Sequence, residues 1–343
     1  MATTTGDWPG WPTVDTTRPA NQTDAPANTK LTAVTDIIDL TNQPYALVIH
    51  GGAGGPHWQM DDAKQVAYRA GLTAAYQTGE AVLAGGGSAL DACCAAVMVL
   101  EDDPLFNAGR GASLTSQGTA EHDAAVMTGD GRAGAVALSR HTRHPVLLAR
   151  AILDTHEVLI ADPPDSFATA AGLELCPNDW FITDERRAKL AALQAGHLNS
   201  ADHIGPGDHK HGTVGCVALD SAGHLAAATS TGGYDGKPPH RIGDTPLIGA
   251  GTWAKNQVVA ISCTGRGESF IQGGVAHQVS ARIEYGGQDV AEAAAATIAG
   301  EVTGRGTKGA LIAVTQSGRC VIAWDAPTLL AAWRDGDTLV THI

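Results

Sequence analysis

The sequence lacks long hydrophobic runs, and basic residues are the minority among its few charged ones. No segment approaches the roughly 18 uninterrupted apolar residues that a membrane-spanning helix needs, so we expect no such segment. Lysine and arginine number 22 against 36 aspartates and glutamates in 343 residues, which gives a formal net charge of −14. This balance disfavours nucleic acid and anionic membrane surfaces as partners, because both attract positive charge.

Cysteine is also scarce, and the spacing of the cysteines argues against disulfide frameworks and zinc sites. The six cysteines form no C-x-x-C pair, and Cys93 and Cys94 are adjacent within a helical pattern. We therefore expect buried free thiols rather than a disulfide framework or a zinc site. The first 30 residues lack the basic start and apolar core of a secretory signal. A cytoplasmic location is the resulting expectation.

The composition changes along the chain. Residues 1–44 are rich in Thr, Pro, Asn and Asp, and we expect an N-terminal extension that is disordered over about its first 30 residues. From Tyr45 the composition is that of a folded domain, which we expect to be single and to span 45–343. The polar stretch 196–212 predicts an exposed linker. Its four histidines could bind a metal, but their irregular spacing favours a solvated linker: His197, His203, His209 and His211.

Hairpin patterns are the main large-scale feature of the domain. Three segments each contain two small or β-branched apolar runs around a Gly/Asp/Ser turn, which predicts antiparallel pairing: 124–138, 213–231 and 310–325. The strands are apolar on both faces, so they must be covered on both sides. We expect an α+β fold in which two stacked sheets are flanked by helices, and helical patterns occur at about 62–84, 145–153, 164–173, 184–195 and 288–301.

A glycine–threonine pair stands where the polar linker meets an apolar strand. If the chain were cut between Gly212 and Thr213, the new α-amine, with an unperturbed pKa of roughly 8, could act as general base for the Thr213 hydroxyl. Strained backbone at the glycine would favour attack of that hydroxyl on its own preceding carbonyl. Taken alone, however, a threonine that opens a strand is ordinary.

Nine motifs in a fixed order give this pair its context. The chain from about residue 45 to 343 resembles the plant-type asparaginase and isoaspartyl peptidase family of N-terminal-nucleophile hydrolases. The motifs that carry the resemblance are HGGAGG (50–55), GGSALDA (86–92), LEDDPLFNAGRGASLT (100–115), DAAVMTG (123–129), FITDERRAKL (181–190), HGTVGCVALD (211–220), ATSTGG (228–233), RIGDTPLIGAGTWA (241–254) and CTGRGESFI (263–271).

The resemblance implies a fold, a cleavage and an assembly. The fold is a four-layer αββα sandwich of two stacked antiparallel sheets between helices. The precursor cuts itself between Gly212 and Thr213 into an α chain, 1–212, and a β chain, 213–343. Two αβ units then form a dimer, (αβ)2.

The resemblance also implies the catalytic and substrate-binding residues. Thr213 is the nucleophile and Thr231 orients it, while Thr264 and Gly265 form an oxyanion hole. Two further residues match those that grip the α-carboxylate and α-ammonium of the substrate, Arg241 and Asp244. A guanidinium suits a carboxylate and a carboxylate suits an ammonium, although Arg-x-x-Asp alone is more often a surface ion pair.

Two weaker assignments come from the segment around residues 100–110. Asn107 is a candidate polar contact near the nucleophile. The family loop that this segment matches wraps a structural sodium ion with backbone carbonyls, which fall here on Leu100, Glu101, Asp103, Phe106, Ala108 and Arg110. Without the resemblance, the segment would be a glycine-rich loop packed through Leu105 and Phe106. No organic cofactor is implied.

The expected activity is hydrolysis of L-asparagine to L-aspartate and ammonia, together with cleavage of β-aspartyl (isoaspartyl) dipeptides. One departure from the family pattern bears on selectivity: Pro238, Pro239 and His240 precede Arg241. The prolines would stiffen the pocket wall and His240, where glycine is usual, could narrow the pocket. The alternatives are a glycosylasparaginase, a threonine endopeptidase, and a non-enzymatic anion-binding module built around HGGAGG.

Overall fold

A computed structural model describes residues 34–39, 44–54, 60–196 and 212–343. All of them belong to the larger of the two units into which the chain divides, Thr32–Ile343. The expected disorder at the start of the extension and the expected solvated linker, with its four histidines, concern residues that lie almost entirely outside these ranges.

Two sheets form the centre of the described domain. The larger has eight strands in the order β13-β12-β2-β6-β7-β3-β4-β5, and the smaller has five in the order β1-β11-β10-β9-β8. The strands of the larger sheet are β2 (Ala46–Gly54), β3 (His122–Thr128), β4 (Ala133–Ser139), β5 (Leu159–Ala161), β6 (Val214–Leu219), β7 (Leu225–Thr231), β12 (Thr328–Asp335) and β13 (Thr338–His342). Those of the smaller are β1 (Val34–Asp39), β8 (Thr252–Lys255), β9 (Val259–Gly265), β10 (Gly309–Thr315) and β11 (Arg319–Trp324).

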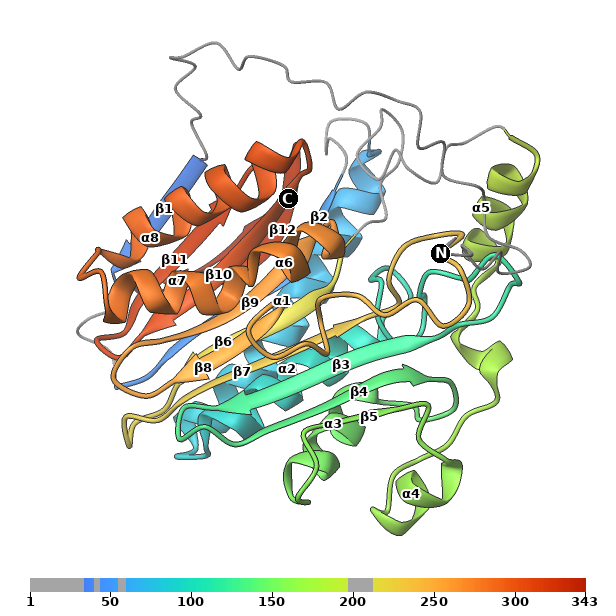
Figure 1. Ribbon diagram of the computed structural model, residues 1–343, viewed down its shortest axis with the longest axis horizontal. Helices are drawn as coiled ribbons and strands as arrows, with labels where there is room; N and C mark the ends of the chain where they lie inside the picture. Colours follow the sequence, from blue (N-terminus) through green and yellow to red (C-terminus); the bar gives the residue numbers. More distant parts are fainter. Residues whose placement is uncertain (1–33, 40–43, 55–59, 197–211) are drawn as a thin grey trace, which may run out of the picture. The chain divides into compact units, whose positions relative to one another are not determined.

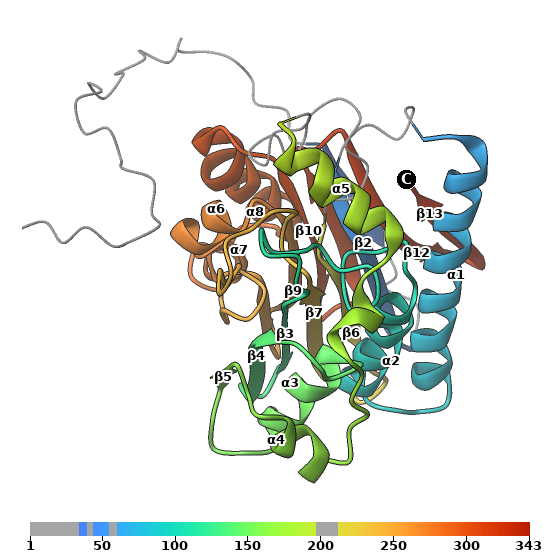
Figure 2. The same cartoon turned by 90° about the vertical axis from the view of Figure 1, so that its right-hand side faces the viewer.

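Helices cover the outer face of each sheet, which gives four layers (Figures 1 and 2). One apolar core lies between the larger sheet and its helices, a second between the two sheets, and a third between the smaller sheet and its helices. The first group of helices is α1 (Asp62–Ala84), α2 (Ala89–Asp102) and α3 (Pro145–Leu153), and the other is α6 (Gly267–Gly273), α7 (Val275–Glu284) and α8 (Val290–Thr297). The αββα sandwich expected from the sequence is confirmed.

The sequence patterns predict most of these elements. All three hairpins are present, as β3–β4, β6–β7 and β10–β11. One expectation needs correction, because β5 pairs with β4 in parallel, so the larger sheet is not wholly antiparallel. Helices α6 and α7 escaped sequence analysis because glycines bound α6 at both ends and Gly274, with a φ of +54°, separates the two.

Part of the segment assigned from the sequence to the extension belongs to a sheet. Residues Val34–Asp39 form β1, which pairs antiparallel with β11 from Val34 opposite Trp324 to Asp39 opposite Arg319. This pairing gives β11 a neighbour on each side, since β10 occupies the other. The folded domain therefore takes in a strand from before residue 45.

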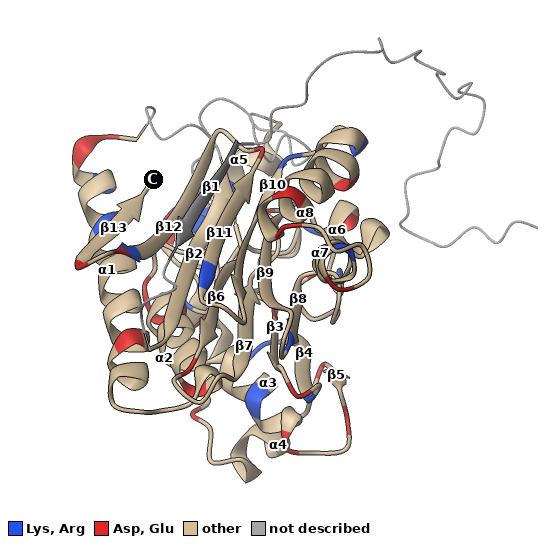
Figure 3. Cartoon of the chain, turned by 90° about the vertical axis from the view of Figure 1, so that its left-hand side faces the viewer, with Lys and Arg blue, Asp and Glu red and all other residues tan. Residues whose placement is uncertain are grey.

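Charged residues occur mostly on helices and turns, and the central strands contain few of them (Figure 3). None of the helices in the described part of the chain is both long and apolar enough to cross a membrane. All six cysteines are free and buried, as the sequence predicts.

A buried arginine fastens helix α5 (Asp184–Gln194) to the loops beside the sheet. The Arg186 side chain is fully buried. Its Nε donates to the Gly111 carbonyl at 2.7 Å, and its Nη1 lies 2.9 Å from both carboxylate oxygens of Asp235. Lys189 also reaches Asp235, at 2.8 Å. Arg186 thus connects α5 to two loops, the one that contains Gly111 and the one after β7 that contains Asp235.

We expect Arg186→Ala to lower the free energy of unfolding by about 3 kcal/mol, because removing one partner leaves a buried carboxylate with weaker compensation. The neighbouring Arg187→Ala is a matched control. Its side chain is 49% exposed and pairs with exposed Asp179, so its loss costs no more than about 1 kcal/mol. Urea unfolding of both variants measures the difference; equal losses would contradict the role of the buried pair.

Candidate active site

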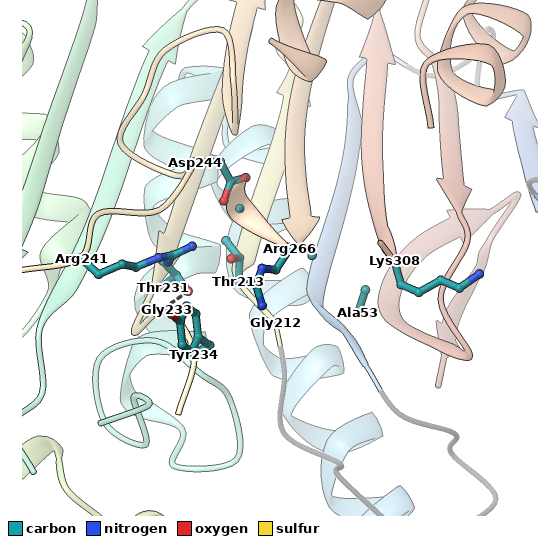
Figure 4. Close-up of a pocket in the computed structure, with 12 residues that line it drawn as sticks. Ala53, Gly212, Thr213, Thr231, Gly233, Tyr234, Arg241, Asp244, Arg266 and Lys308 are labelled. Carbon is teal, nitrogen blue, oxygen red and sulfur yellow. Dashed lines mark hydrogen bonds between the residues drawn. The ribbon is translucent and has the colours of Figure 1, made fainter. Parts of the chain in front are cut away.

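One pocket lies where β6 begins and β7 and β9 end (Figure 4). Its walls come from five separate parts of the chain: the end of β2, the residues before β6, the loop after β7, the segment after β9 and the residue before β10. The lining residues are Ala53, Gly212, Thr213, Thr231, Gly233, Tyr234, Arg241, Asp244, Gly265, Arg266, Gly267 and Lys308.

Thr213 stands at the centre of this pocket, directly before β6. The register of β6 on β7 sets Val214 opposite Ser230, so Thr213 lies opposite Thr231 on the next strand. Its backbone N–H donates to Thr264 Oγ1 at 3.2 Å. Thr213 is 6% exposed, which leaves it sheltered from bulk water but open to the pocket.

The residue before Thr213 has space for no side chain. Gly212 has a φ of +141°, which L-residues other than glycine rarely adopt. A Cβ there would lie 2.2 Å from Gly52 Cα and 2.8 Å from the Ala53 nitrogen. The backbone at the Gly212–Thr213 bond is therefore held against the end of β2 in an unusual conformation.

Thr264 and Gly265, the expected oxyanion-hole residues, lie beside Thr213 at the end of β9. Thr264 Oγ1 accepts from the backbone N–H groups of Ala53 and Thr213, both at 3.2 Å. With two protons accepted, the hydroxyl keeps its own proton to donate in another direction. Gly265 lines the pocket and has a φ of +145°, and a Cβ there would come within 2.6 Å of Gly309 Cα.

A chain of buried polar groups lies beneath Thr213 and has no assignment from the sequence. His50 Nε2 lies 2.8 Å from Ser262 Oγ, which lies 2.8 Å from Thr229 Oγ1, and Thr252 Oγ1 donates to Thr229 at 2.7 Å. Burial lowers the pKa of His50 to about 3, with an opposing effect from the Thr213 backbone, so the ring is neutral at physiological pH. The sequence contains one signal for this chain, the histidine of HGGAGG, but the motif alone does not indicate its hydrogen-bond partners.

The two expected substrate anchors differ in their surroundings. Arg241 is paired with Glu268 Oε1, at 3.2 Å from Nε and 2.9 Å from Nη2. Asp244 is buried, and its Oδ2 accepts no hydrogen bond from the described residues. Burial raises the pKa of Asp244 to about 7, although Arg241 works in the opposite direction. A cationic group bound beside Asp244 would stabilise its charged form.

Three residues around Arg241 were also not assigned from the sequence. The Tyr234 ring contacts two guanidinium groups, with Arg241 Cζ 4.9 Å and Arg266 Cζ 5.5 Å from its centre. Glu268 contacts both arginines. Burial alone would raise the pKa of Glu268, but the two arginines outweigh it and the pKa is lowered. Arg266 and Glu268 occur within the CTGRGESFI motif, yet nothing in their spacing indicates that they meet Tyr234.

Two further residues that the sequence assigned to the site support its walls. Thr231 lines the pocket, and its Oγ1 accepts from the Gly233 N–H at 3.0 Å. Asn107 is not among the lining residues. Its Nδ2 donates to the Gly233 carbonyl at 2.6 Å, and its Oδ1 accepts from the Ser113 N–H at 2.7 Å. Asn107 therefore holds the Gly233 segment from behind.

Several backbone carbonyls of the expected sodium loop make close contacts within the loop. The Glu101 carbonyl accepts from Arg110 N at 2.7 Å, and the Asp103 carbonyl accepts from Phe106 N at 3.1 Å. A Cβ on Gly111 would lie 2.4 Å from the Pro104 carbonyl oxygen and 2.9 Å from that of Phe106. Hard cations take oxygen ligands, and two of the six expected carbonyls, those of Glu101 and Asp103, already accept these N–H donors. In the described residues, no cluster of His, Cys, Asp and Glu side chains offers another metal site.

Comparison with known proteins identifies a family for this arrangement. The family model for asparaginase matches residues 43–343. An isoaspartyl peptidase from Salmonella typhimurium is 42% identical over 305 residues, covering 87% of this chain and 97% of that protein. The isoaspartyl peptidase of Escherichia coli is 43% identical over 305 residues, with 87% and 95% covered. A human isoaspartyl peptidase/L-asparaginase is 37% identical over 294 residues, with 84% and 93% covered.

The expectation that His240 narrows the pocket needs correction. His240 is exposed and is not among the lining residues. Its φ is +66° and its backbone N–H donates to Glu121 Oε2 at 2.9 Å. This left-handed conformation is one that glycine adopts more readily than histidine, so the requirement at this position lies in the backbone turn.

We expect His240→Gly to raise the free energy of unfolding by up to about 1 kcal/mol. The left-handed conformation costs an L-residue about 1–2 kcal/mol, and part of this gain is lost because glycine gives up more conformational entropy on folding. His240→Ala keeps the Cβ and should bring no such gain. Urea unfolding compares the two variants, and kcat/KM for asparagine should be unchanged in both. A large change in kcat/KM would mean that His240 reaches the substrate after all.

Proposed function

The chain belongs to the asparaginase family, and on that premise we propose that it is an autoprocessing threonine amidohydrolase. It hydrolyses L-asparagine to L-aspartate and ammonia and cleaves β-aspartyl dipeptides. The observation that carries the proposal is the Gly212–Thr213 bond in a pocket: a threonine beside hydroxyl and backbone donors, preceded by a glycine with a φ of +141°. That combination suits one residue to two successive reactions.

The first reaction is self-cleavage. Thr213 Oγ attacks the Gly212 carbonyl carbon, the C–N bond to Thr213 breaks, and the nitrogen takes up the hydroxyl proton. This converts the amide into an ester, which water hydrolyses to a Gly212 carboxylate and a free Thr213 with its hydroxyl restored. The φ of +141° at Gly212, outside the backbone regions that other residues adopt, is the observation that favours a strained starting state.

The second reaction uses the new α-amine. The amine takes the proton of the Thr213 hydroxyl as the oxygen attacks the side-chain carbonyl of the substrate. The Thr264 hydroxyl and the Gly265 N–H stabilise the negative oxygen that forms. The C–N bond then breaks, the proton passes to the departing ammonia or amino acid, and water hydrolyses the β-aspartyl ester on Thr213 to release aspartate.

Arg241 and Asp244 anchor the common part of both substrates. Asparagine and β-aspartyl dipeptides share a free α-carboxylate and a free α-ammonium, which the guanidinium and the buried carboxylate can each bind. Glu268 and Tyr234 hold the Arg241 side chain in place through the contacts given above. Thr231 and Asn107 act as positioning residues for the wall of the pocket.

A glycosylasparaginase is the less supported reading. The relatives compared above carry the names isoaspartyl peptidase and isoaspartyl peptidase/L-asparaginase. Assay of a β-aspartyl dipeptide beside a glycosylated asparagine separates the two activities, and turnover of only the second would favour the glycosylasparaginase.

Three further elements complete the proposal. A structural sodium ion would be held by the backbone carbonyls of six residues in the loop and would stabilise the loop through its charge. The six residues are Leu100, Glu101, Asp103, Phe106, Ala108 and Arg110. The mature protein is a dimer of αβ units. Its six free, buried cysteines fit a reducing compartment, and we assign it to the cytoplasm.

Replacing Thr213 by Ala removes the attacking oxygen, so we expect a chain of full length with no amidase activity. Thr213→Ser keeps the hydroxyl and should still be cut. Denaturing gels and mass spectrometry test this directly: wild type and Thr213→Ser should give a fragment that begins at residue 213. Two bands from the alanine variant would overturn the proposal.

The pH dependence of kcat/KM should reveal Asp244. Burial raises the pKa of Asp244 to about 7, and only the ionised carboxylate binds the substrate ammonium, so kcat/KM should fall as the pH drops below about 7. The Thr213 amine, with an unperturbed pKa of roughly 8, must also be deprotonated to act as a base. Below both pKa values, the acid limb of log kcat/KM plotted against pH should therefore approach a slope of about two.

In Asp244→Asn the limiting slope should fall to about one and kcat/KM should drop on the order of 100-fold, as expected when a buried charge pair with the ligand is lost. An acid limb of the same slope in the variant would show that Asp244 does not titrate in the free enzyme.

A further inference from the structure

The pocket holds more positive charge than the shared part of the substrates requires. Three cationic side chains line it, Arg241, Arg266 and Lys308, against one carboxylate, Asp244. Carboxylates outside the lining offset this charge, since Glu268 contacts both arginines and Asp325 pairs with Lys308. Arg241 and Asp244 suffice for an α-carboxylate and an α-ammonium, so the question is which of the other two cations can also reach a ligand.

Arg266 is held firmly in position. Its Nε lies 2.9 Å from Glu268 Oε2, and its guanidinium carbon lies 5.5 Å from the centre of the Tyr234 ring. None of the described residues accepts a hydrogen bond from its two terminal nitrogens. The side chain is 32% exposed, so an anion entering the pocket could reach those nitrogens without displacing a partner.

The cations lie on different sides of the nucleophile. Figure 4 shows Arg241 on one side of Thr213, with Arg266 and then Lys308 toward the other. Lys308 directs its ammonium away from Thr213 and pairs with Asp325 at 2.7 Å. Arg266 is therefore the cation available to whatever group departs from the carbonyl attacked by Thr213.

We propose that Arg266 binds the carboxylate of the departing amino acid in β-aspartyl dipeptides and so makes them better substrates than asparagine. The inference rests on the proposed function. Asparagine loses ammonia, which carries no carboxylate, whereas a dipeptide loses an amino acid with one. A guanidinium whose terminal nitrogens donate to none of the described residues can bind a carboxylate through paired hydrogen bonds.

The test compares β-aspartyl-alanine with its C-terminal amide, because the two substrates differ only in the carboxylate that Arg266 would bind. In the wild type, we expect kcat/KM to be about tenfold higher for the free acid, mainly through a lower KM. Arg266→Gln should bring the two substrates to within about twofold of each other, and Arg266→Lys should restore part of the difference.

A matched control and a third substrate separate the outcomes. Arg132→Gln removes another arginine, 58% exposed and paired with Asp130, and should keep the wild-type preference for the acid. A wild type that does not distinguish acid from amide would overturn this inference while leaving the proposed function intact. An equal fall for acid, amide and asparagine in Arg266→Gln would overturn it as well, since Arg266 would then act through Glu268 on Arg241. No turnover of any substrate by cut wild type would refute the proposed function instead.

Discussion

The contact between Gly52 of β2 and Gly212, two residues before the neighbouring strand β6, is the constraint on which the site depends. Gly212 can lie this close to Gly52 only because Gly212 has no Cβ, and that approach brings the Thr213 and Ala53 amides to the same hydroxyl, Thr264 Oγ1. One close packing event therefore fixes the bond to be cut, the attacking residue and a stabilising hydroxyl together. Any side chain at residue 212 would push all three apart at once.

The polar groups between the two sheets are neutral, whereas the charged groups of the site lie at the pocket. His50, Ser262, Thr229 and Thr252 cross the space between the two sheets as a hydrogen-bonded chain. Burial keeps His50 uncharged, so the chain adds rigidity without placing an unpaired charge in an apolar core. Charge is confined to the pocket walls, where Glu268 bridges two arginines that would otherwise repel each other.

The sequence predicts what depends on local pattern and misses what depends on distant approach. The β6–β7 hairpin follows from apolar runs around a turn, and its register alone sets Thr213 opposite Thr231. The meeting of Tyr234 with Arg266 has no such local signal, since the residues lie in separate loops that only the folded sheets bring together. His240 shows the same limit. Its side chain suggests a pocket contact, but the structure shows that its φ of +66° matters for the backbone turn instead.

The charge distribution indicates where selectivity between substrates must arise. At neutral pH asparagine is a zwitterion without net charge, whereas a β-aspartyl dipeptide with a neutral second side chain carries one net negative charge. A chain with a net charge of −14 repels that dipeptide at long range, although salt screens the repulsion beyond about 8 Å at physiological ionic strength. Attraction must therefore come from short-range contacts inside the pocket. Cations fixed by Glu268 and Tyr234 act over that range and require little rearrangement on binding, so a negatively charged protein can still bind a negatively charged substrate.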